Sequence, residues 1–368
     1  MRIGFLIYGS LDTQTGGYIY DRFVVQGLKK LGHEVEVLSL PCGSYLKKLL
    51  QGFLPTLTRR LLIGSYDVLV QDELCYPTLV AVNTLLRRQQ GPVLVALVHH
   101  LQSQEQRNCW CNRLLAHVEG RYLNSVDGFI HNSATTRSVT ASLISHPKPE
   151  VVAYPAGSRL QKTLSVDEIG RRADKTGALQ LLFFGNIMKH KGLLPLLEDL
   201  CRLDRRLWHL NIVGSTEFDP THVNIVRQLI SKRDMEESVS FFGFLPDGQL
   251  VEILKNCHIF CMPYAYEGFG MAMLESMAFG LPAIASLQGA AKETICHGEN
   301  GFLLAAGDRK GLHTIIYELY QNRSKLAQLA LSARRTYEDS ADWQEGVLAI
   351  EYFLKEMVAT AGRRAEPN

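Results

Sequence analysis

The chain has 368 residues, of which 46% are hydrophobic and 21% are charged, and its formal net charge at pH 7 is +2. This length is sufficient for two domains, and so small a net charge argues against nucleic acid as a partner. The eight cysteines lack the spacing of a zinc site, so we expect most of them to be buried thiols in a reducing compartment, with no bound metal. No run of about 18 apolar residues predicts a transmembrane helix, and residues 1–8 have the pattern of a buried strand rather than a signal peptide. We therefore expect a cytoplasmic protein.

The first half of the chain alternates apolar segments with amphipathic ones. We expect strands at residues 3–8, 34–40, 68–71, 93–99, 128–132 and 151–153, and helices at residues 18–31, 45–62, 77–88, 112–126 and 133–143. Strands that alternate with helices predict a doubly wound parallel sheet of the α/β class, which binds ligands at the carboxyl ends of its strands. We predict that this N-terminal domain spans residues 1–165.

A second α/β series follows. The polar stretch at residues 161–177 is predicted to be a linker. Strands are then expected at residues 179–184, 208–213, 239–242, 259–262, 282–286 and 301–304. They predict a C-terminal domain over residues 176–340, and the amphipathic segment 343–358 is expected to form the last helix.

The richest pattern of chemically useful residues lies within residues 263–302. Glu267 and Glu275 stand eight residues apart around a Gly-Phe-Gly loop that leads into a helical run. A glycine loop at a helix start offers free backbone N–H groups and the positive end of the helix dipole, which suit a phosphate or sugar hydroxyls. Carboxylates accept hydrogen bonds from hydroxyls. The pattern therefore predicts a nucleotide-sugar site, and the alternative is a surface loop before a core helix.

Other polar residues follow predicted strands. Lys191 is a point charge suited to a diphosphate, whose leaving oxygen gains negative charge in the transition state. His99 and His100 end one strand, and Asp72 and Glu73 end another, at the edge where a parallel sheet binds ligands. The alternatives are a solvated loop lysine, a structural histidine and, for Asp72, a helix cap.

Together these segments resemble the family 4 retaining glycosyltransferases. The resemblance rests on the E-x7-E pattern and, in order along the chain, on the pair Gly16-Gly17, the segment FGNIMKHKG and the segment FFGFLPDGQL. It implies the GT-B fold, in which two Rossmann-like domains face each other across a cleft and the last helix packs back on the first domain. It also implies that a nucleotide sugar, expected to be a UDP-sugar, binds mostly to the second domain. A hydroxyl acceptor would bind mostly to the first, and transfer would retain the anomeric configuration without a metal or other cofactor.

The resemblance also implies roles for single residues. Glu267, His99 and Lys191 would act on the transferred sugar and the leaving diphosphate. Asn186 stands where the family commonly has an arginine, so one of two usual cations is missing. The implied donor contacts are Gly16, Gly17, Gly185, Asn186, Lys191, Gly214, Phe244, Glu267, Gly268, Phe269, Gly270, Met271 and Glu275. Acceptor contacts are expected from Asp72, Glu73, His100 and Arg107.

Residues 45–62 read YLKKLLQGFLPTLTRRLL and form a basic amphipathic stretch that Pro55 divides into two short helices. Such a stretch is typical of a contact with an anionic membrane, here the inner face of the cytoplasmic membrane. The acceptor would then be a lipid or a lipid-linked sugar, rather than another glycan or a small molecule. The alternative is a pair of helices packed on the sheet with solvated charges.

Two other functions fit the same sequence. One is a GT-B enzyme of another reaction type, either a nucleotide-sugar epimerase or a sugar phosphorylase. The other is a non-catalytic protein that binds nucleotide sugars, which Asn186 favours and which Lys191, Glu267 and Glu275 argue against.

Overall fold

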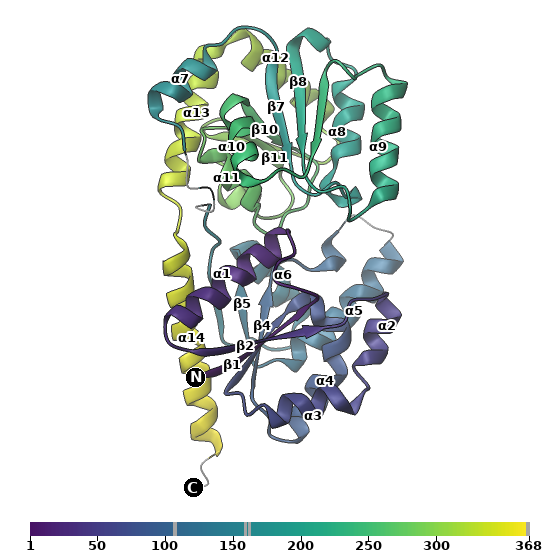
Figure 1. The fold of residues 1–368 in the computed structure, drawn as a ribbon, viewed down its shortest axis with the longest axis vertical. Helices are drawn as coiled ribbons and strands as arrows, with labels where there is room; N and C mark the ends of the chain where they lie inside the picture. The colour runs from purple at the N-terminus through teal and green to yellow at the C-terminus, as the bar shows by residue number, and fades with distance from the viewer. Residues whose placement is uncertain (106–108, 158–159, 161–162, 366–368) are drawn as a thin grey trace. The chain divides into compact units, whose positions relative to one another are not determined.

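The computed structural model describes all residues except 106–108, 158–159, 161–162 and 366–368. The chain divides into two compact units, of which the first comprises Met1–Pro155 with Ala341–Asn368 and the second Ala156–Ser340. Each unit is built on a parallel sheet of six strands with helices on its faces (Figure 1). The predicted α/β class, with two doubly wound parallel sheets, is confirmed.

The elements of the first unit alternate as the sequence predicted. They are β1 (Arg2–Tyr8), α1 (Gly16–Lys30), β2 (Glu34–Leu40), α2 (Tyr45–Gln51), α3 (Pro55–Ile63), β3 (Val68–Asp72), η1 (Glu73–Cys75), α4 (Tyr76–Arg88), β4 (Val93–Val98), η2 (Gln102–Gln104), α5 (Cys109–Ser125), β5 (Gly128–His131), α6 (Ala134–Leu143), β6 (Glu150–Val152) and α14 (Trp343–Ala365). Pro55 stands at the start of α3 and separates it from α2, so the prediction of two short helices is confirmed.

The first sheet has the strand order β2-β1-β3-β4-β5-β6, with every neighbouring pair parallel. The chain runs from β1 outward to β2 and then returns past β1 to β3. The connections after β1 and β3 therefore leave in opposite directions, which creates a topological switch point between these two strands. Every residue of β3 and β4 is buried, as expected for central strands that helices cover on both faces.

The last helix belongs to the first unit. The ring of Trp343 stacks on Phe23 of α1 at a centroid distance of 4.1 Å. His33 Nε2 lies 2.8 Å from Glu351 Oε1 farther along α14. The two helices lie side by side, and α2, α4 and α5 form a second group (Figure 1). The helix extends to Ala365, beyond the predicted end at residue 358.

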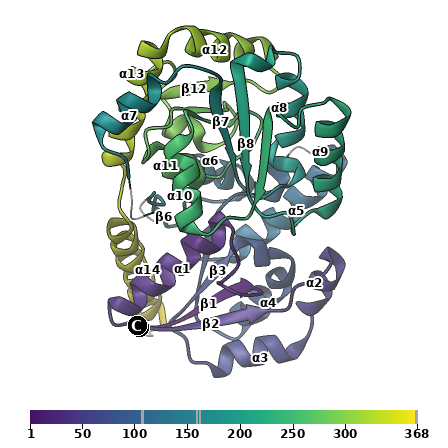
Figure 2. The ribbon, with the colours of Figure 1, turned by 45° about the horizontal axis from the view of Figure 1, so that its top comes forward.

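The second unit repeats the α/β pattern. Its elements are α7 (Val166–Ala173), β7 (Leu179–Phe184), η3 (Lys189–Lys191), α8 (Leu193–Leu200), η4 (Arg205–Leu207), β8 (Trp208–Val213), α9 (Pro220–Lys232), β9 (Val239–Gly243), α10 (Asp247–Asn256), β10 (Ile259–Met262), α11 (Met271–Met277), β11 (Ala283–Ser286), η5 (Ala290–Glu293), β12 (Gly301–Leu304), α12 (Arg309–Gln321) and α13 (Arg323–Glu338). The helices α8 and α9 lie together beside β8 (Figure 2).

The second sheet is also parallel, with the order β12-β11-β10-β7-β8-β9. The chain runs from β7 through β8 to β9 and then crosses back to β10 on the other side of β7. The second switch point therefore lies between β7 and β10. One apolar core supports this sheet and includes Trp208, Phe183 and Phe279.

The predicted linker at residues 161–177 is wrong in one part, because α7 lies within it. Ser165 and Glu168 form a reciprocal capping box, a sequence signal of a helix start that the prediction missed. The Arg172 guanidinium is buried and donates to the carbonyls of Phe279 and Gly280 at 2.8 and 2.6 Å. The helix is therefore part of the second unit and not a free connection.

In the part of the chain that the structure describes, no helix combines the length and the hydrophobicity that crossing a membrane requires.

Candidate functional site

The switch point of the second unit brings two predicted residues together. The loop after β7 carries Lys191, and the loop after β10 carries Glu267. Lys191 Nζ donates a hydrogen bond to Glu267 Oε1 at 2.7 Å. The two side chains are 21% and 28% exposed, so a ligand can reach both. An ion pair so exposed contributes at most about 1 kcal/mol to stability, so a ligand can replace either partner at little cost.

The two loops meet because Gly192 follows Lys191. Gly192 has a φ of +74°, and a Cβ there would lie 2.8 Å from Cβ and 2.9 Å from the carbonyl carbon of Tyr264. A larger residue would therefore push the loop after β10 away. The Tyr264 hydroxyl also donates to Asp199 Oδ2 at 2.5 Å, which fastens this loop to α8.

The backbone of Glu267 has support that the sequence prediction missed. Ala290 N–H donates to the Glu267 carbonyl at 2.9 Å, and Glu267 forms an isolated parallel bridge with Gly289. The loop after β11 therefore braces the loop after β10. The signal in the sequence is a glycine three residues after a predicted strand, which by itself indicates only a turn.

Backbone bonds join the neighbouring strand ends. Gly185 N–H donates to Val213, and Gly214 N–H donates to Gly243, each at 2.9 Å. Asn186 Oδ1 accepts from the Ser215 N–H at 3.4 Å. The structure thus places Gly185, Asn186 and Gly214 on one edge. Phe244, just beyond β9, is 57% exposed.

The Gly-Phe-Gly loop leads into α11 as predicted. Gly270 is the N-cap, and the helix runs from Met271 to Met277. Phe269 is buried, and Gly268 precedes it in the same loop. Glu275 is also buried, on the second turn of the helix. The two glutamates of the E-x7-E pattern therefore differ in environment, because only Glu267 is open to solvent.

The switch point of the first unit gathers a buried cluster of ionisable side chains, Asp21, Asp72, Glu73 and His99. Asp72 ends β3, Glu73 opens η1 and His99 follows β4. His99 Nε2 lies 2.9 Å from Asp21 Oδ1 on α1. The His99 N–H donates to Glu73 Oε2 at 2.9 Å. All four residues are less than a tenth exposed.

Asp21 is the member of this cluster that the sequence prediction missed. It lies within α1, whose buried residues are Tyr20, Asp21, Val24, Val25 and Leu28. The signal is therefore a carboxylate on the apolar stripe of an amphipathic helix, where an unpaired charge is costly.

The cluster sets the protonation of its members. Burial alone lowers the pKa of His99, but Asp21, and after it Glu73 and Asp72, raise this pKa to about 10. Burial, followed by the Asp21 charge, raises the pKa of Asp72 to about 6. Burial and the Asp72 charge raise the pKa of Glu73 well above its usual value. At neutral pH the cluster therefore contains an imidazolium paired with the Asp21 carboxylate.

The predicted acceptor residues have internal partners. Asp72 Oδ1 accepts from the Leu74 N–H at 2.9 Å, so the alternative of a cap is confirmed for this residue. Glu73 supports the backbone of His99, as described above. His100 Nε2 lies 3.1 Å from the buried Glu105. Arg107 lies outside the described residues.

Gly16 and Gly17 open α1 behind the N-cap Thr15. A Cβ on Gly17 would lie 3.3 Å from Cδ2 of His99. The glycine pair thus packs next to the imidazole.

Among the described residues, one group could offer three ligand atoms to a metal ion: Asp21, Asp72 and His99, whose atoms lie within 4.8 Å of one another. The donor set does not favour a metal, because His99 Nε2 is already bonded to Asp21 and a protonated imidazole has no lone pair to give.

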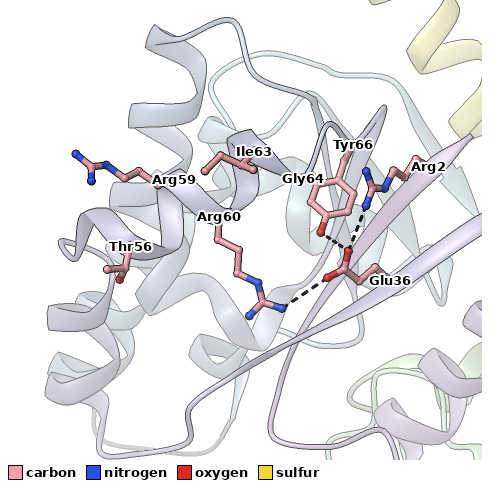
Figure 3. Close-up of a pocket in the computed structure, with 8 residues that line it drawn as sticks. All are labelled: Arg2, Glu36, Thr56, Arg59, Arg60, Ile63, Gly64 and Tyr66. Carbon is pink, nitrogen blue, oxygen red and sulfur yellow. Dashed lines mark hydrogen bonds and ion pairs between the residues drawn. The ribbon is translucent and has the colours of Figure 1, made fainter.

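A pocket of about 580 Å³ lies at the opposite edge of the first sheet, near the amino ends of β1 and β2. Glu36 sits between Tyr66, Arg2 and Arg60 there, whereas Arg59 points away from it (Figure 3). The Tyr66 hydroxyl donates to Glu36 at 2.6 Å. These internal bonds occupy Glu36, the one carboxylate that lines the pocket.

Known proteins share this architecture. Over nearly its whole length the chain is similar to sucrose-phosphate synthase from Thermosynechococcus elongatus, with a TM-score of 0.80 and 18% identity, covering 98% of this chain and 100% of that one. It is also similar to Anabaena HepE in complex with UDP-glucose, with a TM-score of 0.75, 19% identity and coverage of 98% and 100%. The chain therefore has the GT-B fold.

The match to a family model lies in the second unit. Residues 167–336 match the family described as "Glycosyl transferases group 1". The chain is 27% identical over 169 residues to the amylovoran biosynthesis glycosyltransferase AmsK of Erwinia amylovora, which covers 44% of this chain and 40% of that protein. It spans about two fifths of the length of the curated relatives that it matches. The family match therefore covers most of the second unit.

Proposed function

We propose that this protein is a retaining glycosyltransferase that moves a sugar from a nucleotide sugar, expected to be a UDP-sugar, to a hydroxyl acceptor. The observation that carries the proposal is the exposed Lys191–Glu267 pair at the switch point of the second unit. This pair lies within the residues that match the glycosyl transferases group 1. A protein with the same fold has been solved with UDP-glucose, which supports the choice of donor.

Lys191 and Glu267 would exchange partners when the donor binds. The diphosphate carries more negative charge than one carboxylate, so it competes for the Lys191 ammonium. Glu267 is then released to accept hydrogen bonds from sugar hydroxyls. In the transition state Lys191 stabilises the charge that develops on the leaving phosphate, without a metal.

Backbone and neighbouring side chains complete the proposed donor site. The N–H groups near Gly270 and Met271 face the diphosphate, Glu275 holds the ribose hydroxyls, and the strand ends near Gly214 and Phe244 receive the base. Asn186 supplies an uncharged amide, so Lys191 is the main cation of this set. The first unit contributes His99 for a hydroxyl of the transferred sugar.

The first experiment measures binding and slow hydrolysis of UDP-, GDP- and ADP-sugars by the wild-type protein and by Lys191→Ala. The matched control is Lys255→Ala, because Lys255 also pairs with a glutamate at 2.7 Å in the same unit. We expect one donor to bind, and only Lys191→Ala to lose it. Equal binding by all three proteins would refute the donor site.

Product analysis separates the proposal from its alternatives. A retained anomeric configuration in the transferred sugar, read by NMR, supports the proposal. A rearranged nucleotide sugar would indicate an epimerase, and a sugar phosphate would indicate a phosphorylase. Binding without turnover under any acceptor would indicate a non-catalytic nucleotide-sugar-binding protein.

We also propose that residues 45–62 contact an anionic membrane, which makes a lipid or lipid-linked acceptor the first to try. Leu46, Leu50, Phe53 and Leu54 are all more than half exposed. Exposed Lys47, Arg59 and Arg60 flank this apolar surface on α2 and α3. An apolar surface edged by cations binds the interface of anionic lipids.

Co-sedimentation with vesicles tests this contact. We expect binding to vesicles that contain phosphatidylglycerol, weaker binding to phosphatidylcholine alone, and loss of binding for the double variant Leu50→Glu/Phe53→Glu. The control is Tyr352→Glu on α14, which removes an exposed aromatic residue far from 45–62 in the sequence. Binding that the double variant leaves unchanged would exclude this surface.

A further inference from the structure

We propose that Asp21 is a positioning residue that holds the His99 imidazole in one orientation and one charge state, so that Nδ1 is a charged hydrogen-bond donor to the transferred sugar. The proposal rests on the proposed function, because that function supplies the sugar to which His99 would donate a hydrogen bond. It goes further by assigning a role to Asp21 and by naming the ring nitrogen that acts.

The contacts of the ring fix its orientation. One edge of the imidazole faces α1, because Nε2 bonds Asp21 and Cδ2 lies against Gly17. The ring of Tyr20 meets the imidazole edge-on at a centroid distance of 5.3 Å. Nδ1 lies on the ring edge away from these contacts and has no hydrogen bond among the residues that the structure describes.

The backbone of His99 is held as firmly as its ring. Its N–H donates to Glu73 Oε2 at 2.9 Å, and its carbonyl accepts from Asn132 Nδ2, also at 2.9 Å. A 180° flip of the ring would put Cε1 in the place of Nε2 and so break the bond to Asp21. The structure therefore leaves Nδ1 as the atom available to a ligand.

The environment of Asp21 supports this role. Its side chain is fully buried, Oδ1 bonds His99, and Oδ2 lacks a hydrogen-bond partner among the described residues. A buried carboxylate with one partner is costly. The placement of Asp21 therefore indicates that its role is to present a negative charge to His99.

The charge state follows from the groups that face the ring. The acids that face the ring are Asp21 on α1, Asp72 at the end of β3 and Glu73 on η1. The Tyr20 side chain, also on α1, is uncharged. With these neighbours the pKa of His99 is raised to about 10, after the opposing effect of burial. Between pH 6 and 9 Nδ1 then bears a proton. Charge-assisted hydrogen bonds are about twice as strong as neutral ones, so a sugar hydroxyl oxygen would be bound firmly.

The decisive variant is Asp21→Asn, which keeps the shape and the accepting oxygen but removes the charge. Histidine labelled at Cε1 and read by NMR reports the charge of His99, whose signal is identified by its absence in His99→Gln. We expect the wild-type signal to stay in the imidazolium position up to about pH 9. In Asp21→Asn it should titrate near the ordinary value of about 6.5. A wild-type His99 that titrates near that value overturns the proposal, whether or not the protein transfers sugar.

The pH profile of transfer gives a second readout that a merely structural role would not move. We expect Asp21→Asn to lose at least tenfold in kcat at pH 8 and to recover activity toward pH 6, where His99 regains its proton. Asp21→Glu, which restores the charge, should recover part of the rate at pH 8. Asp127→Asn is the control, because Asp127 is an acid of the same unit that accepts from Leu94 N–H at the amino end of β4.

The outcomes of this experiment can be told apart. A loss in Asp21→Asn that is equal at every pH overturns the proposal, because it shows a structural role. No transfer by the wild-type protein with any donor refutes the proposed function, and the histidine spectra then decide the role of Asp21 without it. Circular dichroism and the Tm of each variant show whether it is folded.

Discussion

The two units place opposite kinds of site at the switch points of their sheets. At the first switch point, three carboxylates and His99 are buried together, and Asp21 and Glu73 are bonded to His99. At the second, Lys191 and Glu267 form one exposed pair between two loops. Buried charges are expensive to separate, whereas exposed pairs exchange partners easily. We infer that the first unit holds its charged groups in a fixed arrangement, and that the second unit has a binding site whose ion pair opens for the ligand.

The variant with the largest expected effect is Glu267→Gln in the exposed pair. We expect transfer to fall about 100-fold, as for the loss of one transition-state contact. The free energy of unfolding should change by less than about 1 kcal/mol, because the pair is exposed. The measurements are kcat with the identified donor and urea unfolding. Glu318→Gln is the matched control, since Glu318 pairs with Lys325 at 2.6 Å in the same unit. A large loss of stability in Glu267→Gln would contradict the inference that this ion pair contributes little to the stability of the fold.

The buried cluster should behave in the opposite way. His99→Ala removes the one basic side chain of the cluster and leaves the Asp21 carboxylate without its partner. We expect the first unit to lose about 3 kcal/mol of stability at pH 7, measured by urea unfolding. The double variant His99→Ala/Asp21→Ala should be more stable than His99→Ala alone, because the unpaired charge is gone. A double variant that is less stable than the single one would show that the cluster is held by packing rather than charge.

The cluster should also make the first unit sensitive to alkali. The pKa of His99 is raised to about 10 in the folded chain, by Asp21 against the effect of burial, and is about 6.5 when unfolded. The stabilisation is therefore complete below pH 6.5 and is lost as the pH rises toward 10. The slope is at most about 1.4 kcal/mol per pH unit. We expect the Tm to fall between pH 7 and pH 9.5, and this fall to be smaller in Asp21→Asn. A flat wild-type profile would contradict the assignment.

The second unit contains a buried histidine with the opposite response. Burial, and next the Arg172 charge, lower the pKa of His258 to about 4. Its Nδ1 accepts from Gln180 N–H at 2.9 Å, which requires a neutral ring. This contribution is present above pH 6.5 and is lost as the pH falls toward 4. We expect a loss of about 1.5 kcal/mol between pH 6.5 and pH 5.

Trp208 allows the acid response to be read for the second unit alone. It is the tryptophan of the second unit and is buried there, whereas Trp110 and Trp343 belong to the first unit. Urea unfolding of the variant Trp110→Phe/Trp343→Phe, followed by fluorescence at each pH, isolates the signal. An acid response that persists in His258→Asn would assign it to other groups.

Most of the fold could be predicted because its signals are local. All the predicted strands are present in the described part of the chain, each end within one residue of its predicted position. Apolar runs, Pro55 and the glycines that end strands each specify nearby structure. The helix α7 was missed because its apolar stripe is short, and only the capping box at Ser165 and Glu168 marked it.

Candidate site residues could be predicted where polar side chains come directly after a strand in the sequence. They could not be predicted where they depend on contacts between distant parts of the chain. The pairing of Lys191 with Glu267 could be expected because parallel strands end at one edge. Asp21 was missed because its partner, His99, is far away in the sequence, and no local pattern joins them. The burial of Glu275 was missed for the same reason, since a helical position does not show which face packs.

The return of the last helix to the first unit has a consequence for how the chain is made. The ribosome synthesises residues 1–155 before the second unit and α14 after it. At about 5–20 residues per second the interval is roughly 10 to 40 s. During that time the second unit can fold completely, while Phe23 on α1 still lacks Trp343, on which its ring stacks in the folded chain. The first unit begins before the second and is completed after it, so nascent chains should expose the α1 face to chaperones until α14 has been synthesised.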